Sequence, residues 1–494
     1  MVAATEFEIL NFARPLDVHT WSDYPEVNNF VELIFEDLKG VDGNRKTIRK
    51  LLKVVLLDLY VAWCSDPDLK LMFSRDNNAY AAKSRYSELF IGKKIIEVVD
   101  ALVACGLVNE KRGFNDRSTG FAVLTRLWPT ARLIAHFKKA KFHQFHVHNH
   151  EDREVIILRD EDKEDVEYVD KDQDLDLAAM RTVLRDYNKL LARTHTDIET
   201  LEEPVIQLGE GKAKRSLPIN QRTKFVHRIF NNSRWDHGGR FYGGWWQRCP
   251  KAWRTQIVFD GVRAMELDYS GLHIVILYAQ EGINYWKEIG KDPYQIDCVE
   301  SFNPEIDVRS AAKLLLLTAI NADNEKTAFG AFRYQSETYS AEKRMKNKQL
   351  GNILDQLKEK HPAISHKIAS GAGIELMNIE SQITEQIIRR FTYHYKCPIL
   401  SIHDSYLVPF GYDRILHEEM CNAFLEVTGM SGVIIKHTQD YYDIVQAGFP
   451  PGEEPEDFEL LAPTERHKTE RELFNAFKGK PSVEDWHPDW TMVW

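Results

Sequence analysis

Two apolar segments far apart in the chain each lead to an aspartate, and this feature constrains the fold more than any other. The first is TQIVFDGVRAMEL, which leads to Asp268 and then to the helix-like HIVILYAQEG. The second is PILSIHDSYLVP, which is typical of strand, tight turn and strand, with His403 and Asp404 at the turn. A strand that ends on an aspartate places the carboxylate at a sheet edge, where it can hold a hard cation. The sequence therefore predicts a β-sheet that carries two acidic residues.

Asp268 and Asp404 are the residues that we predict to be catalytic and to bind metal. Two aspartates from distant strands can hold two magnesium ions about 3.5 to 4 Å apart, the arrangement used for in-line phosphoryl displacement. One ion lowers the pKa of the attacking hydroxyl, and the other stabilises the departing pyrophosphate. We expect two Mg2+ ions as the cofactor, with Mn2+ as an alternative. Simpler roles stay open, because Asp268 could cap the next helix and Asp404 could stabilise the turn.

Between the two aspartates, the run VRSAAKLLLLTAIN at residues 308–321 predicts a helix. Its spacing of four puts Arg309, Lys313, Leu317 and Asn321 on one face. Two cations one turn apart could bind a triphosphate. Leu317 and Asn321 would then lie towards the base and the sugar.

In this order, the three elements resemble motifs A, B and C of the A-family DNA polymerases and of the single-subunit phage and organellar RNA polymerases. Asp268-Tyr-Ser with its helix is similar to motif A of the DNA enzymes, Arg309-x-x-x-Lys313 to their fingers helix, and Ile-His-Asp404-Ser to motif C of the RNA enzymes. The resemblance covers roughly residues 205–450. It implies an α+β palm, fingers and thumb domain with a small antiparallel palm sheet. It also implies Tyr269 as a nucleotide-binding residue and His403 near the primer end.

Two further elements and three departures accompany this resemblance. Gly238-Gly-Arg240-Phe resembles the glycine-arginine element that contacts primer-template, and residues 376–382, which include Glu380, occupy the place of a helix beneath the active site. Ser405 replaces a second acid. His273, five residues after Asp268, and Asn321 replace the residues that the DNA enzymes use at those places, which leaves the choice of sugar open.

The first 142 residues predict a winged helix. Residues 44–64 and the run from about Gly92 to Gly106 carry apolar positions at helical spacing, and residues 107–129 form two β-like runs around a polar turn. This module resembles the winged-helix domains of plasmid and phage replication proteins, which implies DNA binding; packing against a protein alone is the alternative. The basic residues expected on its surface are Lys93, Lys94, Lys111, Arg112, Arg117 and Arg126.

The net charge of −11 hides an uneven distribution. Acids dominate residues 151–203, and basic residues dominate residues 212–263. Phe241, Tyr242, Trp245 and Trp246 interleave with the basic residues, which offers phosphate contacts and stacking surfaces. The simpler interpretation is a solvated basic face over an aromatic core.

We expect four parts in the chain of 494 residues. They are a winged-helix DNA-binding domain at 1–142, an acidic linker with a thumb-like helix at 143–205, a palm with fingers at 206–460 and a tail at 461–494 that carries Trp486, Trp490 and Trp494. The six cysteines form no C-x-x-C pair, which argues against a zinc module. Neither a membrane span nor a secretory signal is recognisable, so we expect a cytoplasmic protein without a membrane partner.

These features together predict a nucleotidyltransferase that uses a DNA template, a primer and nucleoside triphosphates. A DNA polymerase or primase-polymerase of a phage or mobile element is the leading hypothesis, with a helicase or single-strand-binding protein as a further partner. One alternative is a single-subunit DNA-directed RNA polymerase. The other is a non-catalytic DNA-binding replication or defence factor with a degenerate palm.

Overall fold

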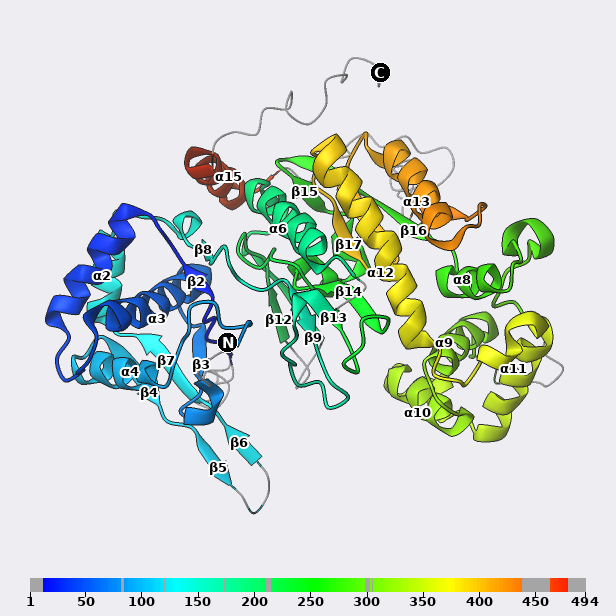
Figure 1. Ribbon diagram of the computed structural model, residues 1–494, viewed down its shortest axis with the longest axis horizontal. Coiled ribbons are helices and arrows are strands. Elements are labelled where there is room, and N and C mark those ends of the chain that lie inside the picture. Colours follow the sequence, from blue (N-terminus) through cyan, green and yellow to red (C-terminus); the bar gives the residue numbers. More distant parts are fainter. Residues whose placement is uncertain are drawn as a thin grey trace. The chain divides into compact units, whose positions relative to one another are not determined.

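The computed structural model describes residues 12–80, 84–116, 118, 121–172, 175–209, 215–297, 303, 305–437 and 463–478. Within these residues the protein is a mixed α+β structure with several small sheets (Figure 1). The chain divides into two units. Unit 1 comprises residues 1–155, 200–225 and 463–481, and unit 2 comprises residues 156–199, 226–462 and 482–494.

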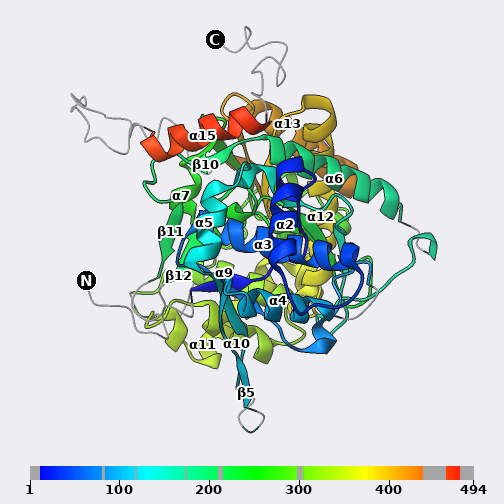
Figure 2. The same ribbon diagram turned by 90° about the vertical axis from the view of Figure 1, so that its left-hand side faces the viewer.

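Unit 1 is built around α3 (Arg45–Ser65), a helix whose central turns are buried on all sides. Asn44 caps the start of α3 by accepting hydrogen bonds from the backbone amides of Lys46 and Thr47. Helices α2 (Pro25–Asp37) and α4 (Lys94–Ala104) pack against α3, and Figure 2 shows α2 and α3 side by side. The two helices expected from the apolar spacing of this region are therefore confirmed as helices.

A four-stranded sheet completes the core of unit 1. Its strand order is β1 (Ala13–Pro15), β3 (Lys70–Phe73), β7 (Thr125–Pro129) and β4 (Val108–Lys111). Strands β5 (Phe114–Asp116) and β6 (Phe121–Val123) form a hairpin between β4 and β7. The other regular elements described in this unit are β2 (Thr20–Trp21), α5 (Ala131–Lys139), β8 (His148–Asn149), β11 (Val205–Leu208), β12 (Arg215–Pro218) and α15 (Glu465–Lys478).

Unit 2 contains a six-stranded antiparallel sheet. Its central strand is β16 (Val262–Tyr269), which pairs with β18 (Ser405–Pro409) along one edge. The other edge of β16 pairs with β15 (Ile257–Phe259) near its start and with β19 (Ile435–His437) near its end. At the two margins, β10 (Thr196–Ile198) pairs with β15, and β17 (Leu400–Ile402) pairs with β18. The segments on either side of Asp404 are thus two strands of one hairpin, as the sequence predicts.

Helix α12 (Gly373–Arg390) packs against α13 (Asp413–Thr428) and α8 (Leu272–Gln280) in unit 2. Figure 1 shows α6 (Leu177–Arg193) alongside α12, and the Tyr187 hydroxyl of α6 donates a 2.7 Å hydrogen bond to the carbonyl of Ile399. The segment expected to form a thumb-like helix is therefore helical, and it contacts the residue that precedes β17. Helices α9 (Val308–Ile320), α10 (Glu325–Gln335) and α11 (Asn347–Lys360) form a separate group.

A small sheet of β14 (Gly238–Tyr242), β13 (His227–Phe230) and β9 (Ile156–Leu158) lies in the same unit. Strand β9, within the segment expected to be an acidic linker, instead pairs in parallel with β13 and buries Ile156. Gly239 has a φ of 81°, and a Cβ there would lie 2.9 Å from the Ser381 Oγ. A glycine at this position therefore permits the close approach of β14 to α12.

Some expectations fall on residues outside those that the structure describes. These are Arg117, residues 212–214 at the start of the basic stretch, and the tryptophans Trp486, Trp490 and Trp494. Among the described residues, no helix has the length and apolar character that crossing a membrane requires.

Candidate active site

Asp268 and Asp404 come from neighbouring strands of the six-stranded sheet. Strand β16 carries Asp268 opposite Ser405, the first residue of β18, and Asp404 is the residue before it. The backbone amide of Tyr269 donates a 3.3 Å hydrogen bond to the carbonyl of Asp404. Asp268 and Asp404, which are 136 positions apart in the sequence, are therefore brought together at one end of β16.

The hairpin turn that holds Asp404 is as tight as the sequence predicts. Ile402 pairs with Ser405, so His403 and Asp404 alone connect β17 to β18. His403 has a φ of 55°, in the left-handed region that two-residue hairpin turns require. The chain leaves β16 through Gly271, which has a φ of 68° and precedes α8. Both aspartates are thus fixed by backbone geometry on short connections.

The two carboxylates lie in an environment that disfavours their ionised forms. Burial, followed by the charges of Asp404 and Glu266, raises the pKa of Asp268 to about 7. Burial, followed by the charge of Glu380, raises the pKa of Asp404. The positive charges of Lys313 and Lys251 act on Asp268 in the opposite direction and offset only part of this effect. Within the described part of the chain, neither aspartate forms an ion pair with a Lys, Arg or His side chain.

This pair of aspartates fits a divalent cation. Carboxylate oxygens are the ligands that magnesium prefers, and magnesium sites in phosphoryl-transfer proteins commonly use one or two of them. Burial and neighbouring acids raise the pKa of both carboxyl groups, and a cation held by Asp268 and Asp404 would favour their ionised forms. The chemistry of the donors and their excess negative charge therefore match the expected cofactor.

Two other carboxylates nearby are already neutralised. Glu266, two residues before Asp268 on the same face of β16, accepts hydrogen bonds of 2.7 and 3.1 Å from Arg254 and one of 3.0 Å from the Ser405 hydroxyl. Ser405, which stands where a second acid was expected by resemblance, therefore binds an acid from the adjacent strand. Glu266 was not predicted as a site residue, although alternation along the strand could have indicated it.

Glu380 is the second neutralised carboxylate, and it is 1% exposed. Arg240 binds it through two nitrogens, with the Nε–Oε1 distance 2.9 Å, and His273 contacts it at 2.9 Å. Although burial opposes ionisation, the hydrogen bond from His273 and the charge of Arg240 lower the pKa of Glu380. Helix α12 thus holds Arg240 and His273 together next to the hairpin of Asp404.

The four residues predicted on one face of α9 have different surroundings. Arg309 and Lys313 are exposed. The charge of Lys313 partly opposes the rise in the pKa of Asp268. Arg309 forms an ion pair of 2.7 Å with Asp292. Leu317 is half-buried, and the Asn321 amide caps the end of α9 by donating a 2.7 Å hydrogen bond to the Leu317 carbonyl.

Tyr294 was missed by the sequence analysis. The Lys313 ammonium lies 5.6 Å from the centre of the Tyr294 ring, and the Arg309 guanidinium lies 5.8 Å from it. After burial, the charge of Asp404 is the largest cause of the raised pKa of the Tyr294 hydroxyl. The residue therefore connects the cations of α9 with the acidic end of β16, and no spacing in the sequence indicates this.

Tyr269 does not face the site, which corrects its predicted role in nucleotide binding. It is 2% exposed, and its hydroxyl donates a 2.5 Å hydrogen bond to the carbonyl of Met420. Successive side chains of a strand point to opposite faces. Since Asp268 occupies the face of the site, its neighbour Tyr269 packs in the core.

The basic and aromatic stretch does not form a stacking surface. Trp245 and Trp246 are fully buried, and Phe241 is 5% exposed. Several arginines of the stretch are bound to carboxylates, including the pairs Arg228–Glu385, Arg240–Glu380, Arg254–Glu266, Arg234–Asp236 and Arg263–Glu199. The simpler interpretation, an aromatic core with basic residues over it, describes these residues better, and many of the charges are internal.

The predicted DNA-binding residues of unit 1 lie at the start of α4 and after β4. Lys93 precedes α4 and forms no ion pair among the described residues, whereas Lys94 pairs with Glu97 at 2.6 Å. Arg112 is 66% exposed and pairs with Glu110 at 2.9 Å. The ion pairs reduce the positive charge that Lys94 and Arg112 can offer to a phosphate.

Comparisons with known proteins include a weak likeness to a polymerase structure. No family model matches the sequence, and no curated protein matches it. Among solved structures, the fold is similar to the POL domain of Pol1 from M. smegmatis in complex with DNA primer-template and dNTP. The identity is 12% and the TM-score 0.29, over 42% of this chain and 47% of that chain. The chain thus spans about half the length of that structure, and a likeness at this level assigns no activity.

Proposed function

We propose that this protein is a template-directed nucleotidyltransferase, a DNA polymerase or primase-polymerase, with its active site at Asp268 and Asp404. One observation carries the proposal: two adjacent aspartates at the end of an antiparallel strand form no ion pair within the described residues, while the carboxylates beside them do. Perturbed pKa values of this kind cluster at functional sites. The exposed Lys313 supplies positive charge on the same side.

The side chains of the site would divide the work as follows. Asp268 and Asp404 hold divalent cations, which supply charge stabilisation for phosphoryl transfer when bound. Lys313 and, further along α9, Arg309 neutralise the triphosphate. Tyr294 keeps both cations oriented through its ring. Arg240 and Glu380 hold His273 in a fixed position beside the nucleotide, in the place where the resemblance locates selection of the sugar.

Unit 1 would bind the nucleic acid. Its helix α3, helix α4 and the extended hairpin of β4 to β7 follow one another as in a winged helix. Lys93, at the start of α4, carries a charge that is available to a phosphate. Lys94 and Arg112 would contribute less, because both are ion-paired.

The test is extension of a labelled primer on a DNA template, and of a bare single-stranded template, with dNTPs or NTPs and Mg2+. Wild type should give product, and Asp268→Ala and Asp404→Ala should each lose about a thousandfold or more in rate, since a metal-assisted step is worth several kcal/mol. Asp355→Ala, an exposed aspartate of α11, is the matched control and should keep full activity. Equal activity in wild type and both site variants would refute the proposal.

A single-subunit RNA polymerase is the second candidate, because Ser405 and His273 replace two acids expected of a DNA enzyme. The same assay distinguishes the two functions by the sugar that is incorporated. Product from NTPs in preference to dNTPs would favour the RNA polymerase. DNA binding without any product would favour a non-catalytic DNA-binding factor.

A further inference from the structure

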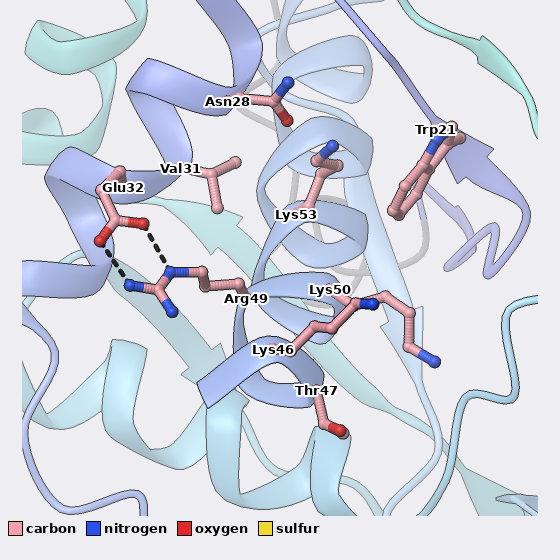
Figure 3. A pocket seen from close by; sticks show the side chains of 9 residues that line it. All are labelled: Trp21, Asn28, Val31, Glu32, Lys46, Thr47, Arg49, Lys50 and Lys53. Carbon is pink, nitrogen blue, oxygen red and sulfur yellow. Dashed lines mark hydrogen bonds and ion pairs between the residues drawn. The ribbon is translucent and has the colours of Figure 1, made fainter. Parts of the chain in front are cut away.

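Unit 1 contains a cavity of about 350 Å³ that the proposed polymerase function does not use. It lies between α2 and the first turns of α3, with Trp21 of β2 at its side (Figure 3). Cavities that hold small molecules usually measure about 300 to 1,000 Å³. This cavity is therefore large enough for an organic ligand and not merely for a single ion.

The walls of the cavity carry an excess of positive charge. Its cationic side chains are Lys46, Arg49, Lys50 and Lys53, and Glu32 is the acidic residue in its lining. Arg49 binds both oxygens of Glu32, at 2.5 and 2.6 Å, as the dashed lines in Figure 3 mark. Four cations against one carboxylate leave three ammonium groups, and none of these three is ion-paired to a carboxylate among the described residues.

Two of the three ammonium groups are held at the cavity by neutral contacts. Lys53 donates a 3.0 Å hydrogen bond to the carbonyl of Ser22, and its ammonium lies 4.1 Å from the centre of the Trp21 ring. Lys50 donates to the carbonyl of Leu89, and Lys46 is exposed. A carbonyl compensates an ammonium charge only in part, so each of these groups can still gain from an anion.

Burial of these lysines costs free energy that an anion would return. Burial lowers the pKa of Lys53, although Asp23 nearby acts in the opposite direction. Burial and then the charge of Lys46 lower the pKa of Lys50. The carboxylate of Asp23 accepts a hydrogen bond of 2.8 Å from the Trp21 indole and does not reach ion-pair distance of Lys53. The site is thus pre-organised for negative charge.

The rest of the lining is suited to a planar organic group. Trp21 and Val31 supply apolar surface, and Asn28 supplies an amide with both donors and acceptors. In Figure 3, Asn28, Val31 and Trp21 lie at the upper side of the view, and Lys46 and Thr47 lie below them. The Lys53 ammonium lies among these three groups, 4.1 Å from the centre of the Trp21 ring, whereas Lys50 and Lys46 lie below it. Apolar and amide groups at one end with two ammonium groups at the other match a base joined to phosphates.

We propose that this cavity binds a nucleotide, with its phosphates at Lys46 and Lys50, its base towards Val31 and Asn28, and the Lys53 ammonium between the two ends beside Trp21. Lysine carries a compact point charge that commonly binds phosphate. Three lysines match a ligand with several negative charges better than they match a ligand with a single carboxylate. The nucleotide is either a free nucleoside triphosphate or the terminal, 5′-phosphorylated residue of a strand. The lining residues all belong to unit 1, whereas Asp268 and Asp404 belong to unit 2.

Binding to the full-length protein tests this proposal. The probes are a fluorescently labelled ATP and two labelled oligonucleotides of one sequence, with a 5′-phosphate or a 5′-hydroxyl end. Titrations are done in EDTA and with the Lys313→Ala substitution in every variant, so that the proposed polymerase site contributes little. Lys46→Gln with Lys50→Gln is the test variant, because both residues lie nearer the surface than Lys53, and Lys39→Gln with Lys138→Gln is the control.

The test variant should weaken binding about tenfold or more for each ammonium removed, since hydrogen bonds to charged groups are worth about 1.5 to 3 kcal/mol. The control should bind like its parent. Loss of ATP binding identifies a free nucleotide as the ligand, and loss confined to the 5′-phosphorylated strand identifies a strand end. Equal affinity in test and control variants with an unchanged circular dichroism spectrum, or no binding of ATP with equal binding of both strands, would overturn the proposal. Neither result depends on the outcome of the primer-extension assay, so the two proposals can fail separately.

Discussion

The carboxylates of unit 2 fall into two groups that differ in their partners more than in their burial. Glu380 is almost fully buried and has a lowered pKa, because Arg240 and His273 hold its ionised form. Asp268 is less buried and has a pKa of about 7, because burial and then the charges of Asp404 and Glu266 disfavour its ionised form. Burial alone therefore does not decide whether a carboxylate is ionised. The arrangement of charges around it does.

This difference indicates two roles. A buried carboxylate bound by an arginine holds the fold together, and removing either partner leaves an uncompensated charge. Two adjacent carboxylates that no cation neutralises lower the free energy of unfolding. Such pairs are typical of sites where a ligand compensates their charge. The pair of Glu380 and Arg240 is thus expected to be structural, and the pair of Asp268 and Asp404 functional.

The largest effect on stability should come from Arg240→Met. This change leaves Glu380, whose side chain is 2% exposed, without its bidentate partner. Breaking a buried pair costs about 3 to 5 kcal/mol of unfolding free energy. Urea unfolding followed by tryptophan fluorescence measures this cost. The double variant Arg240→Met with Glu380→Leu should recover a large part of it, and failure to do so would mean that the arginine acts through packing alone.

Asp268→Asn should stabilise the metal-free protein at high pH. The folded-state pKa of about 7 lies above the ordinary value of 3.8 for an aspartate, so the stabilising form is the protonated one. Its contribution is complete below about pH 4 and is lost as the pH rises through 7. At pH 8 the substitution should therefore raise the unfolding free energy by about 1 to 3 kcal/mol, after allowance for solvent screening, and at pH 5 by much less. Equal effects at both values would contradict the raised pKa.

Magnesium should stabilise wild type in the same pH range. A ligand that binds only the folded protein at about 100 times its dissociation constant adds about 2.7 kcal/mol. Because protons compete for the same oxygens, the gain should be large at pH 8 and small at pH 6. Thermal unfolding with Mg2+ or with EDTA measures it. The gain should vanish in Asp268→Asn, whereas Asp355→Asn should keep it.

The sequence predicts the difference between the two groups of carboxylates only in part. Asp268 and Asp404 could be found because each follows a short apolar run, and strand geometry depends on neighbours in the sequence. The partners of the arginines could not, because Arg240 meets Glu380 across 140 positions, a contact that only the tertiary fold creates. The same limit explains the assignment of Tyr269 to the site, since the sequence does not show which face of a strand meets α13. It also explains β9, whose partner β13 lies far along the chain.

The smallest effect on stability should come from Arg309→Ala. This change tests whether burial decides how much an ion pair contributes to the unfolding free energy. Arg309 binds Asp292 at 2.7 Å, a distance similar to that between Arg240 and Glu380, but the two side chains are 45% and 37% exposed. Water screens an exposed pair and competes for its hydrogen bonds, so such pairs contribute about 0 to 1 kcal/mol. Urea unfolding should therefore give nearly the wild-type midpoint, while nucleotide affinity falls because α9 loses a cation. A loss of stability as large as that of Arg240→Met would show that the geometry of an ion pair, rather than its removal from water, governs its contribution in this protein.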